Sequence, residues 1–146
     1  MRVERRVEVI GGYPVRYTLA GQQGEPVVLV HGLSGSTRWW AENVEPLSKR
    51  YRVYLVDLPG FGAMRRSPLR LGIQAAAGWL VRWIEAMSLG PVHLVGHSMG
   101  GHICLRIAAE RPDMVNRLAL VAPAVWFGRG SLFGSIVPLV DETRRF

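Results

Sequence analysis

The sequence has very little cysteine, and this limits how the chain can be held together. Its single cysteine, Cys104, cannot form an internal disulfide. A disulfide-stapled scaffold is therefore excluded, and the fold must rest on an apolar core. Because Cys104 lies in the apolar pattern of a helix, we expect a small buried residue rather than a reactive thiol.

Long hydrophobic runs and internal repeats are also missing. No window offers the roughly 18 uninterrupted apolar residues of a membrane span, and the charged residues 1–6 lead into residues 7–9 without the apolar region of a signal peptide. The 146 residues are 49% hydrophobic and 20% charged, with 17 glycines and 9 prolines, which is typical of one globular domain rich in tight turns. We therefore expect a soluble, cytoplasmic protein without a membrane partner.

Lysine is nearly absent, although the net charge is +7. Lys49 is the only lysine among 18 basic residues, and the arginines are scattered, with short pairs at residues 5–6, 65–66 and 144–145. A nucleic-acid surface would need a basic stripe, and none is visible. With abundant alanine and glycine, the arginine preference indicates coding bias, and no nucleic-acid partner is expected.

The pattern of strands and helices predicts an α/β fold. Alternating runs at residues 6–10 and 15–19, separated by a Gly-Gly-Tyr-Pro turn, predict an antiparallel hairpin. Continuous apolar runs follow at residues 26–30, 53–56, 92–95 and 118–122. Parallel strands covered by helices on both faces have this character. The expected fold is thus a mostly parallel sheet flanked by helices, with an N-terminal antiparallel hairpin.

Three helices are expected between these strands. The first is capped by Ser36 or Thr37 and runs to about Lys49, and the third runs from near Met99 to residues 111–112. The second covers about residues 72–87, and its apolar side chains recur at the spacing of one helix face, which predicts that they pack on the sheet. These side chains are Ala76, Trp79, Leu80, Trp83, Ile84 and Met87.

Residues 92–101 carry the strongest chemical signal. A strand-type run stops at Gly96, Ser98 follows, and glycines 100 and 101 open a helix. The sequence Gly96-His97-Ser98-Met99-Gly100 fits the nucleophile elbow, in which a strained backbone holds the serine hydroxyl clear of the sheet. A Cβ at either flanking glycine would collide with neighbouring backbone. A plain turn would fit the pentapeptide alone, but the strand before it and the helix after it favour the elbow.

Two further strand ends carry candidate support for Ser98. Residues 30–36 pass from a strand into a Gly/Ser loop containing His31, Gly32 and Leu33. If this strand lies beside the elbow strand, the N–H groups of Leu33 and Met99 can form an oxyanion hole. For His31 we expect a structural role, holding the loop through side-chain hydrogen bonds.

Asp57 ends another strand and precedes the turn of residues 58–62. We expect its carboxylate to accept backbone N–H groups rather than to act as a catalytic acid. Gly60 and Gly62 do not form a dinucleotide loop, because Arg65 replaces the third glycine and no helix begins there. No cofactor and no metal site is predicted.

Together the segments 31–33, 57–62 and 96–101 resemble the α/β-hydrolase superfamily, over residues 6–122. The resemblance implies Ser98 as the nucleophile, Leu33 and Met99 as the oxyanion hole, and His31, Gly32, Gly96, His97 and Gly100 as support for the elbow and loop. A serine nucleophile implies esterase, C–C hydrolase, perhydrolase or lyase members rather than aspartate-dependent dehalogenases or epoxide hydrolases. One departure is Ala63, where many members have serine.

The larger departure concerns the rest of the triad. The family order is serine, then acid, then histidine, and His102 is the only histidine after Ser98. We expect His102 to be a packed helix residue. The chain therefore resembles the N-terminal half of a hydrolase, with residues 1–122 as part of the core, residues 123–146 as the start of a cap, and the last strands lacking. An open sheet edge and an apolar tail predict self-association or pairing with a C-terminal half.

Two functional hypotheses follow from these observations. The first is a serine hydrolase that acts on an ester or similar small acyl substrate through an acyl-enzyme on Ser98, and that is inactive or weakly active as this chain alone. The second is a non-catalytic remnant that keeps the fold for binding or assembly.

Overall fold

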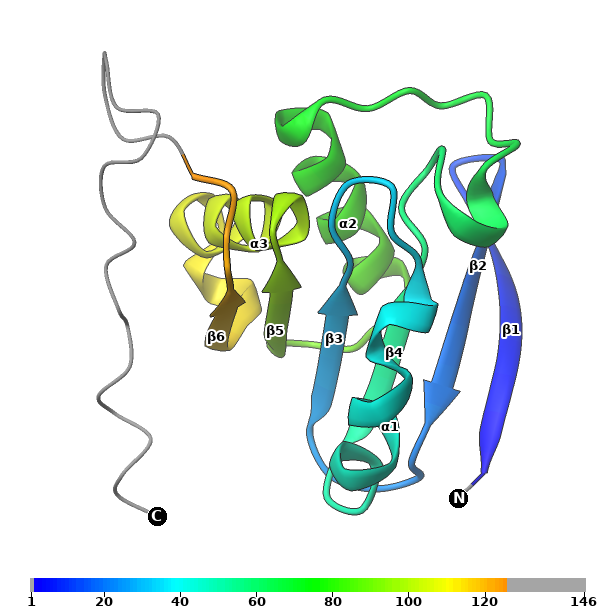
Figure 1. Ribbon diagram of the computed structural model, residues 1–146, viewed down its shortest axis with the longest axis vertical. Helices are drawn as coiled ribbons and strands as arrows, with labels where there is room; N and C mark the ends of the chain where they lie inside the picture. Colours follow the sequence, from blue (N-terminus) through cyan, green and yellow to red (C-terminus); the bar gives the residue numbers. More distant parts are fainter. Residues whose placement is uncertain (1, 126–146) are drawn as a thin grey trace.

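The computed structural model describes residues 2–125, which fold around a six-stranded sheet with the order β1-β2-β4-β3-β5-β6 (Figure 1). The strands are β1 (Val3–Ile10), β2 (Tyr13–Ala20), β3 (Pro26–Val30), β4 (Arg52–Val56), β5 (Val92–His97) and β6 (Val115–Val121). The helices are α1 (Ala41–Ser48), α2 (Ile73–Ala86) and α3 (Met99–Glu110), with short 3-10 turns η1 (Thr37–Trp40), η2 (Gly62–Met64) and η3 (Pro112–Met114).

The N-terminal hairpin joins the parallel part of the sheet through β2. Strands β1 and β2 pair antiparallel across Gly11 and Gly12, which both have positive φ as a tight hairpin turn requires. Strand β2 also pairs antiparallel with β4, whereas β3 pairs parallel with β4 and β5, and β5 with β6. The predicted mixed sheet with an antiparallel hairpin is confirmed.

Helices cover both faces of the sheet, and β3 shows why its sequence is continuously apolar. All five of its residues are buried. Val28 and Val30 pack in one cluster with residues of α2 and α3, while Val27 and Leu29 pack in a second cluster with Val44 of α1. Figure 1 shows α1 in front of the sheet. A strand between two helix layers has no wet face, so its sequence shows no alternation.

The core face predicted for the second helix is confirmed in α2. The side chains of Ala76, Trp79, Leu80, Trp83 and Ile84 are buried, and Met87 packs partly buried against the same cluster. Cys104 of α3 is also fully buried, and burial raises the pKa of its thiol. The side chain is therefore a buried core residue, as expected from the sequence.

Some element boundaries differ from the prediction. The first helix is divided into η1 and α1, with the Ser36 hydroxyl accepting the Arg38 N–H at the start of η1. Strand β6 begins at Val115 rather than at residue 118, because Asn116 and Arg117 extend the strand with exposed polar side chains. An apolar run underestimates a strand whose ends reach solvent.

The expected cap, residues 123–146, lies outside the described residues from position 126 onward. Among the described helices, none has the length and apolar character needed to cross a membrane.

Candidate active site

Ser98 stands between β5 and α3 in a conformation that serine rarely adopts. Its φ of 51° and ψ of −116° place it in a strained region of backbone space. The surrounding chain holds it there: the Ser98 N–H donates to the Val121 carbonyl at 3.0 Å, and the Ser98 carbonyl accepts from His102 N–H at 3.1 Å and Ala124 N–H at 2.9 Å. The turn therefore has the local geometry of a nucleophile elbow.

The glycines on either side of Ser98 have the steric cause expected from the sequence. A Cβ added to Gly96 would lie 2.5 Å from the Gly100 carbonyl oxygen. A Cβ added to Gly100 would lie 2.4 Å from the carbonyl oxygens of Val30 and His31. All these contacts are with backbone atoms, which cannot rotate away. Only glycine lets β3, β5 and α3 meet this closely around Ser98.

The loop after β3 lies directly against the elbow. Val30 pairs with Gly96 in the sheet, and a Cβ on Gly32 would stand 3.1 Å from the Ser98 Cβ and 3.0 Å from the His97 Nδ1. The Gly35 N–H donates to the Gly32 carbonyl at 3.0 Å and closes the loop. Residues 31–33 and Ser98 are thus neighbours, as expected if these two strands are adjacent in the sheet.

The two backbone N–H groups expected to form the oxyanion hole directly follow Gly32 and Ser98 in the chain. Within residues 2–125, the N–H groups of Leu33 and Met99 have no protein hydrogen-bond acceptor. Leu33 follows Gly32 in the loop, and Met99 follows Ser98 at the first position of α3. Such donors can bind an oxygen that develops negative charge beside Ser98.

His31 is fully buried and is held by two hydrogen bonds. Its Nε2 accepts the Leu58 N–H at 3.0 Å, so its Nδ1 carries the proton and donates to the Gly32 carbonyl at 2.8 Å. The ring also meets Phe61 edge to face, with centroids 5.5 Å apart. Burial lowers the pKa of His31 and favours this neutral form. The hydrogen bonds expected of His31 are present, and they tie the loop to the end of β4.

Asp57 joins three segments at the end of β4. Its Oδ1 accepts the Thr37 N–H at 2.7 Å, and its Oδ2 accepts the Ala63 N–H at 2.8 Å. Gly62, at φ 49°, passes so near that a Cβ there would lie 2.4 Å from the Asp57 carboxylate. Both oxygens of this buried group are occupied by the backbone. The carboxylate is an acceptor for N–H groups, as expected from the sequence.

The remaining histidines occupy three different places. His93 pairs through Nε2 with Glu25 Oε2 at 3.0 Å. It lies five residue steps before Ser98 along β5, a distance on the order of 16 Å. His97 packs against Trp39, and His102 lies in the first turns of α3. Among residues 2–125 no three metal-ligating side chains gather into a possible metal site.

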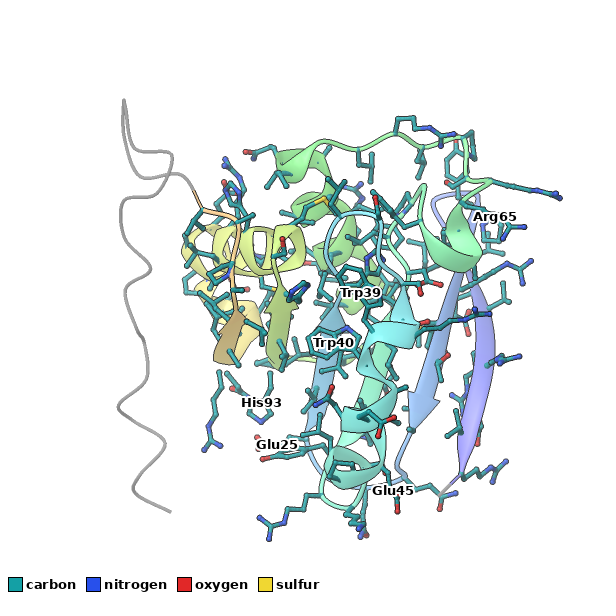
Figure 2. The ribbon with its side chains drawn as sticks, viewed as in Figure 1. Glu25, Trp39, Trp40, Glu45, Arg65 and His93 are labelled. Carbon is teal, nitrogen blue, oxygen red and sulfur yellow. The ribbon has the colours of Figure 1, made fainter. Side chains whose placement is uncertain are left out.

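Trp39 is a site neighbour that sequence reasoning missed. Its ring meets His97 edge to face, with centroids 5.1 Å apart, and a Cβ on Gly35 would lie 3.1 Å from the indole. The side chain is 51% exposed, unlike the buried Trp40 next to it. Figure 2 shows the two tryptophans on the same turn, above α1. Adjacent tryptophans give no sequence signal of which one faces the site.

The fold and the turn at Ser98 agree with the family to which the chain is similar in sequence. The model of the alpha/beta hydrolase fold family matches residues 25–145. The chain therefore belongs to the α/β-hydrolase fold family, and the resemblance noted in the sequence is confirmed.

The relatives include an acetyltransferase component and an esterase, and each relative is longer than this chain. The chain is 38% identical over 121 residues to the dihydrolipoyllysine-residue acetyltransferase component of the acetoin cleaving system of Cupriavidus necator, covering 82% of this chain and 32% of that protein. It is 36% identical over 118 residues to a pimeloyl-[acyl-carrier protein] methyl ester esterase of Aeromonas hydrophila, covering 81% and 45%. The solved structure of a bacterial membrane phospholipase A matches with a TM-score of 0.81 and 27% identity, covering 88% and 42%. The chain thus spans less than half the length of these relatives.

Proposed function

We propose that this chain provides the nucleophile and the oxyanion-binding groups of a serine hydrolase that acts on an ester or similar small acyl substrate. The observation that carries the proposal is the strained backbone of Ser98 between two glycines that admit no Cβ. A nucleophile must stand clear of the sheet, and a strained turn between a strand and a helix is the backbone arrangement that provides this position. The esterase among the relatives supports an ester substrate.

The proposed reaction proceeds through an acyl-enzyme. Ser98 Oγ attacks the substrate carbonyl carbon and loses its proton to a base, while the carbonyl oxygen becomes an oxyanion between the N–H groups of Leu33 and Met99. The tetrahedral intermediate then collapses, the bond to the leaving alcohol breaks, and that alcohol takes up a proton. Water attacks the acyl-enzyme in the same way and releases the acid and free Ser98.

On this proposal the catalytic base is neither His31 nor His93. His31 uses both ring nitrogens inside the fold, and Nε2 of His93 pairs with Glu25 at the far end of β5. In the family the acid and the histidine follow the serine in sequence. We propose that both belong to a C-terminal half, joined to this chain or paired with it.

Two exposed apolar side chains provide the proposed contact surface for the acyl group. Leu33 is 63% exposed beside Gly32, and Trp39 is half exposed against His97. Exposed side chains of this size beside a nucleophile offer apolar area to a substrate. On this proposal, Trp39 orients the acyl chain and does not take part in proton transfer.

Fluorophosphonate labelling followed by peptide mapping tests the nucleophile. We expect slow labelling that is confined to Ser98 and is abolished by Ser98→Ala, because an unassisted hydroxyl is a weak nucleophile. Ser88→Ala is the matched control, since Ser88 also has a positive φ, at 50°, but lies in the turn that follows α2 and not in the elbow. Labelling at other serines, or labelling that persists in Ser98→Ala, would contradict the proposal.

A further inference from the structure

A basic cleft lies apart from the residues placed around Ser98. It has a volume of about 480 Å³ and opens between the start of β2 and the segment that follows β4. Tyr17 of β2 pairs with Val56 of β4, and this pairing brings Arg16 beside that segment. Figure 2 shows Arg65 near the same ends of β1 and β2. The lining residues are Tyr13, Pro14, Arg16 and residues 62–68.

Three arginine residues line this cleft, and its lining includes no acidic residue. Arg16, Arg65 and Arg66 are exposed and have no ion-pair partner among residues 2–125. Other arginines of the chain do find acids, such as Arg106 with Glu110 and Arg111 with both Glu85 and Asp113. The positive charge of the cleft is therefore not neutralised by the described part of the fold.

Two acids of the adjoining strands, Asp57 and Glu8, cannot serve as internal counter-ions. Asp57 is buried and already accepts backbone N–H groups with both oxygens. Glu8 pairs with Val15 across the hairpin, whereas Arg16 pairs with Val7. Because neighbouring residues of a strand face opposite sides of the sheet, Glu8 and Arg16 point away from each other. An anion from outside is the partner that this charge fits.

The walls of the cleft are held in place before any ligand binds. The Ala63 N–H is fixed by Asp57, and the buried Met64 closes its turn through the Gly60 N–H, which donates to the Met64 carbonyl at 3.0 Å. The Ser67 N–H donates to the same carbonyl at 2.9 Å. Because this wall is already ordered, less conformational entropy is lost when a ligand binds.

We infer that this cleft binds the phosphoryl group of a phosphorylated ligand. Guanidinium groups match phosphate oxygens with paired N–H donors, and three of them favour a group with more than one negative charge. Tyr13 and Ser67, whose hydroxyl groups can donate hydrogen bonds, belong to the same lining. The inference is independent of Ser98 and goes beyond the proposed hydrolase reaction.

Calorimetric titration of the 146-residue chain with inorganic pyrophosphate tests the site. At physiological ionic strength we expect saturable binding, weakened about tenfold by each of Arg16→Gln, Arg65→Gln and Arg66→Gln. Arg82→Gln is the matched control, because Arg82 is exposed on α2 and lies outside the cleft. Failure of pyrophosphate to bind saturably, or equal binding by all four variants, would overturn the inference.

Parallel measurements identify the source of the phosphoryl group. If the chain binds vesicles that contain phosphatidic acid and Arg65→Gln abolishes this binding, the site is supported and the phosphoryl group belongs to a lipid headgroup. If the chain binds pyrophosphate but not these vesicles, the site is supported and the ligand is soluble. Binding only to an RNA oligomer, unaffected by the three cleft variants, would overturn it as non-specific charge attraction. Fluorophosphonate labelling of Ser98 should be the same in Arg65→Gln, so a failure of the nucleophile proposal remains distinguishable.

Discussion

Gly96 and Gly100 approach each other across the elbow so closely that no room is left for a side chain on Gly96. A Cβ on Gly96 would stand 2.5 Å from the carbonyl oxygen of Gly100. The two glycines flank Ser98 symmetrically in sequence, and each faces backbone rather than a movable side chain. Their absence of side chains is what lets strand and helix enclose the turn. The conformation of Ser98 therefore depends on both of them.

Gly96→Ala and Gly100→Ala should each lower the free energy of unfolding by about 3 kcal/mol or more, because backbone must shift to admit the methyl group. Gly78→Ala is the control: its Cβ would meet only the Arg82 side chain, at 3.5 Å. In the interior of α2 this change should stabilise the chain by about 0.5–1 kcal/mol. Urea unfolding measures all three, and an unchanged midpoint in Gly96→Ala would contradict the elbow packing.

Asp57→Asn tests the junction at the end of β4. An amide keeps one acceptor oxygen but turns an NH₂ group toward the N–H of Thr37 or Ala63, so we expect a loss of about 1–3 kcal/mol in the free energy of unfolding. Asp113→Asn, at an exposed surface ion pair with Arg111, should leave the free energy of unfolding almost unchanged. Equal effects of the two substitutions would show that Asp57 is not the junction described.

His31 should make stability depend on pH in a defined direction. Its pKa is lowered in the folded chain from an ordinary value of 6.5, so the unfolded chain takes up the proton first as the pH falls. The contribution of His31 is therefore complete above about pH 6.5 and declines as the pH falls through the lowered pKa.

A comparison of the wild type with His31→Gln measures the contribution of His31 to the free energy of unfolding. At neutral pH we expect the variant to be less stable by about 1–3 kcal/mol, because it disturbs the buried bonds to Gly32 and Leu58. The difference should shrink between pH 7.5 and pH 5, as measured by urea unfolding at each pH. His102→Gln serves as the control, and a difference that grows toward acid pH would show the opposite sign.

The features that the sequence predicted well depend on local patterns. Strand β3 has the predicted bounds, and α2 buries the predicted face, because each element's own residues determine which sides are apolar. The elbow was also predictable, since Gly96, Ser98 and Gly100 lie within one turn and their steric relation is fixed by adjacency.

The features that the sequence could not predict join distant segments. Trp39 meets His97, and Thr37 donates to Asp57, only because β3, β4 and β5 are neighbours in the sheet. The basic cleft likewise forms where the pairing of β2 with β4 brings Arg16 to residues 62–68. None of these pairs has a spacing or periodicity that marks it in the chain. The catalytic roles of Ser98, Leu33 and Met99 remain predictions.

The most direct test of the account is the rate at which this chain hydrolyses p-nitrophenyl acetate, measured with and without Ser98→Ala. Loss of a triad base costs on the order of 10⁶ in kcat, while oxyanion binding leaves roughly 10³–10⁴ over water. We predict that the 146-residue chain acts barely above background with little dependence on Ser98, and that joining it to a C-terminal half bearing the acid and histidine produces a rate that Ser98→Ala abolishes. A large Ser98-dependent rate in the chain alone, or a completed protein whose rate ignores Ser98, would contradict the account.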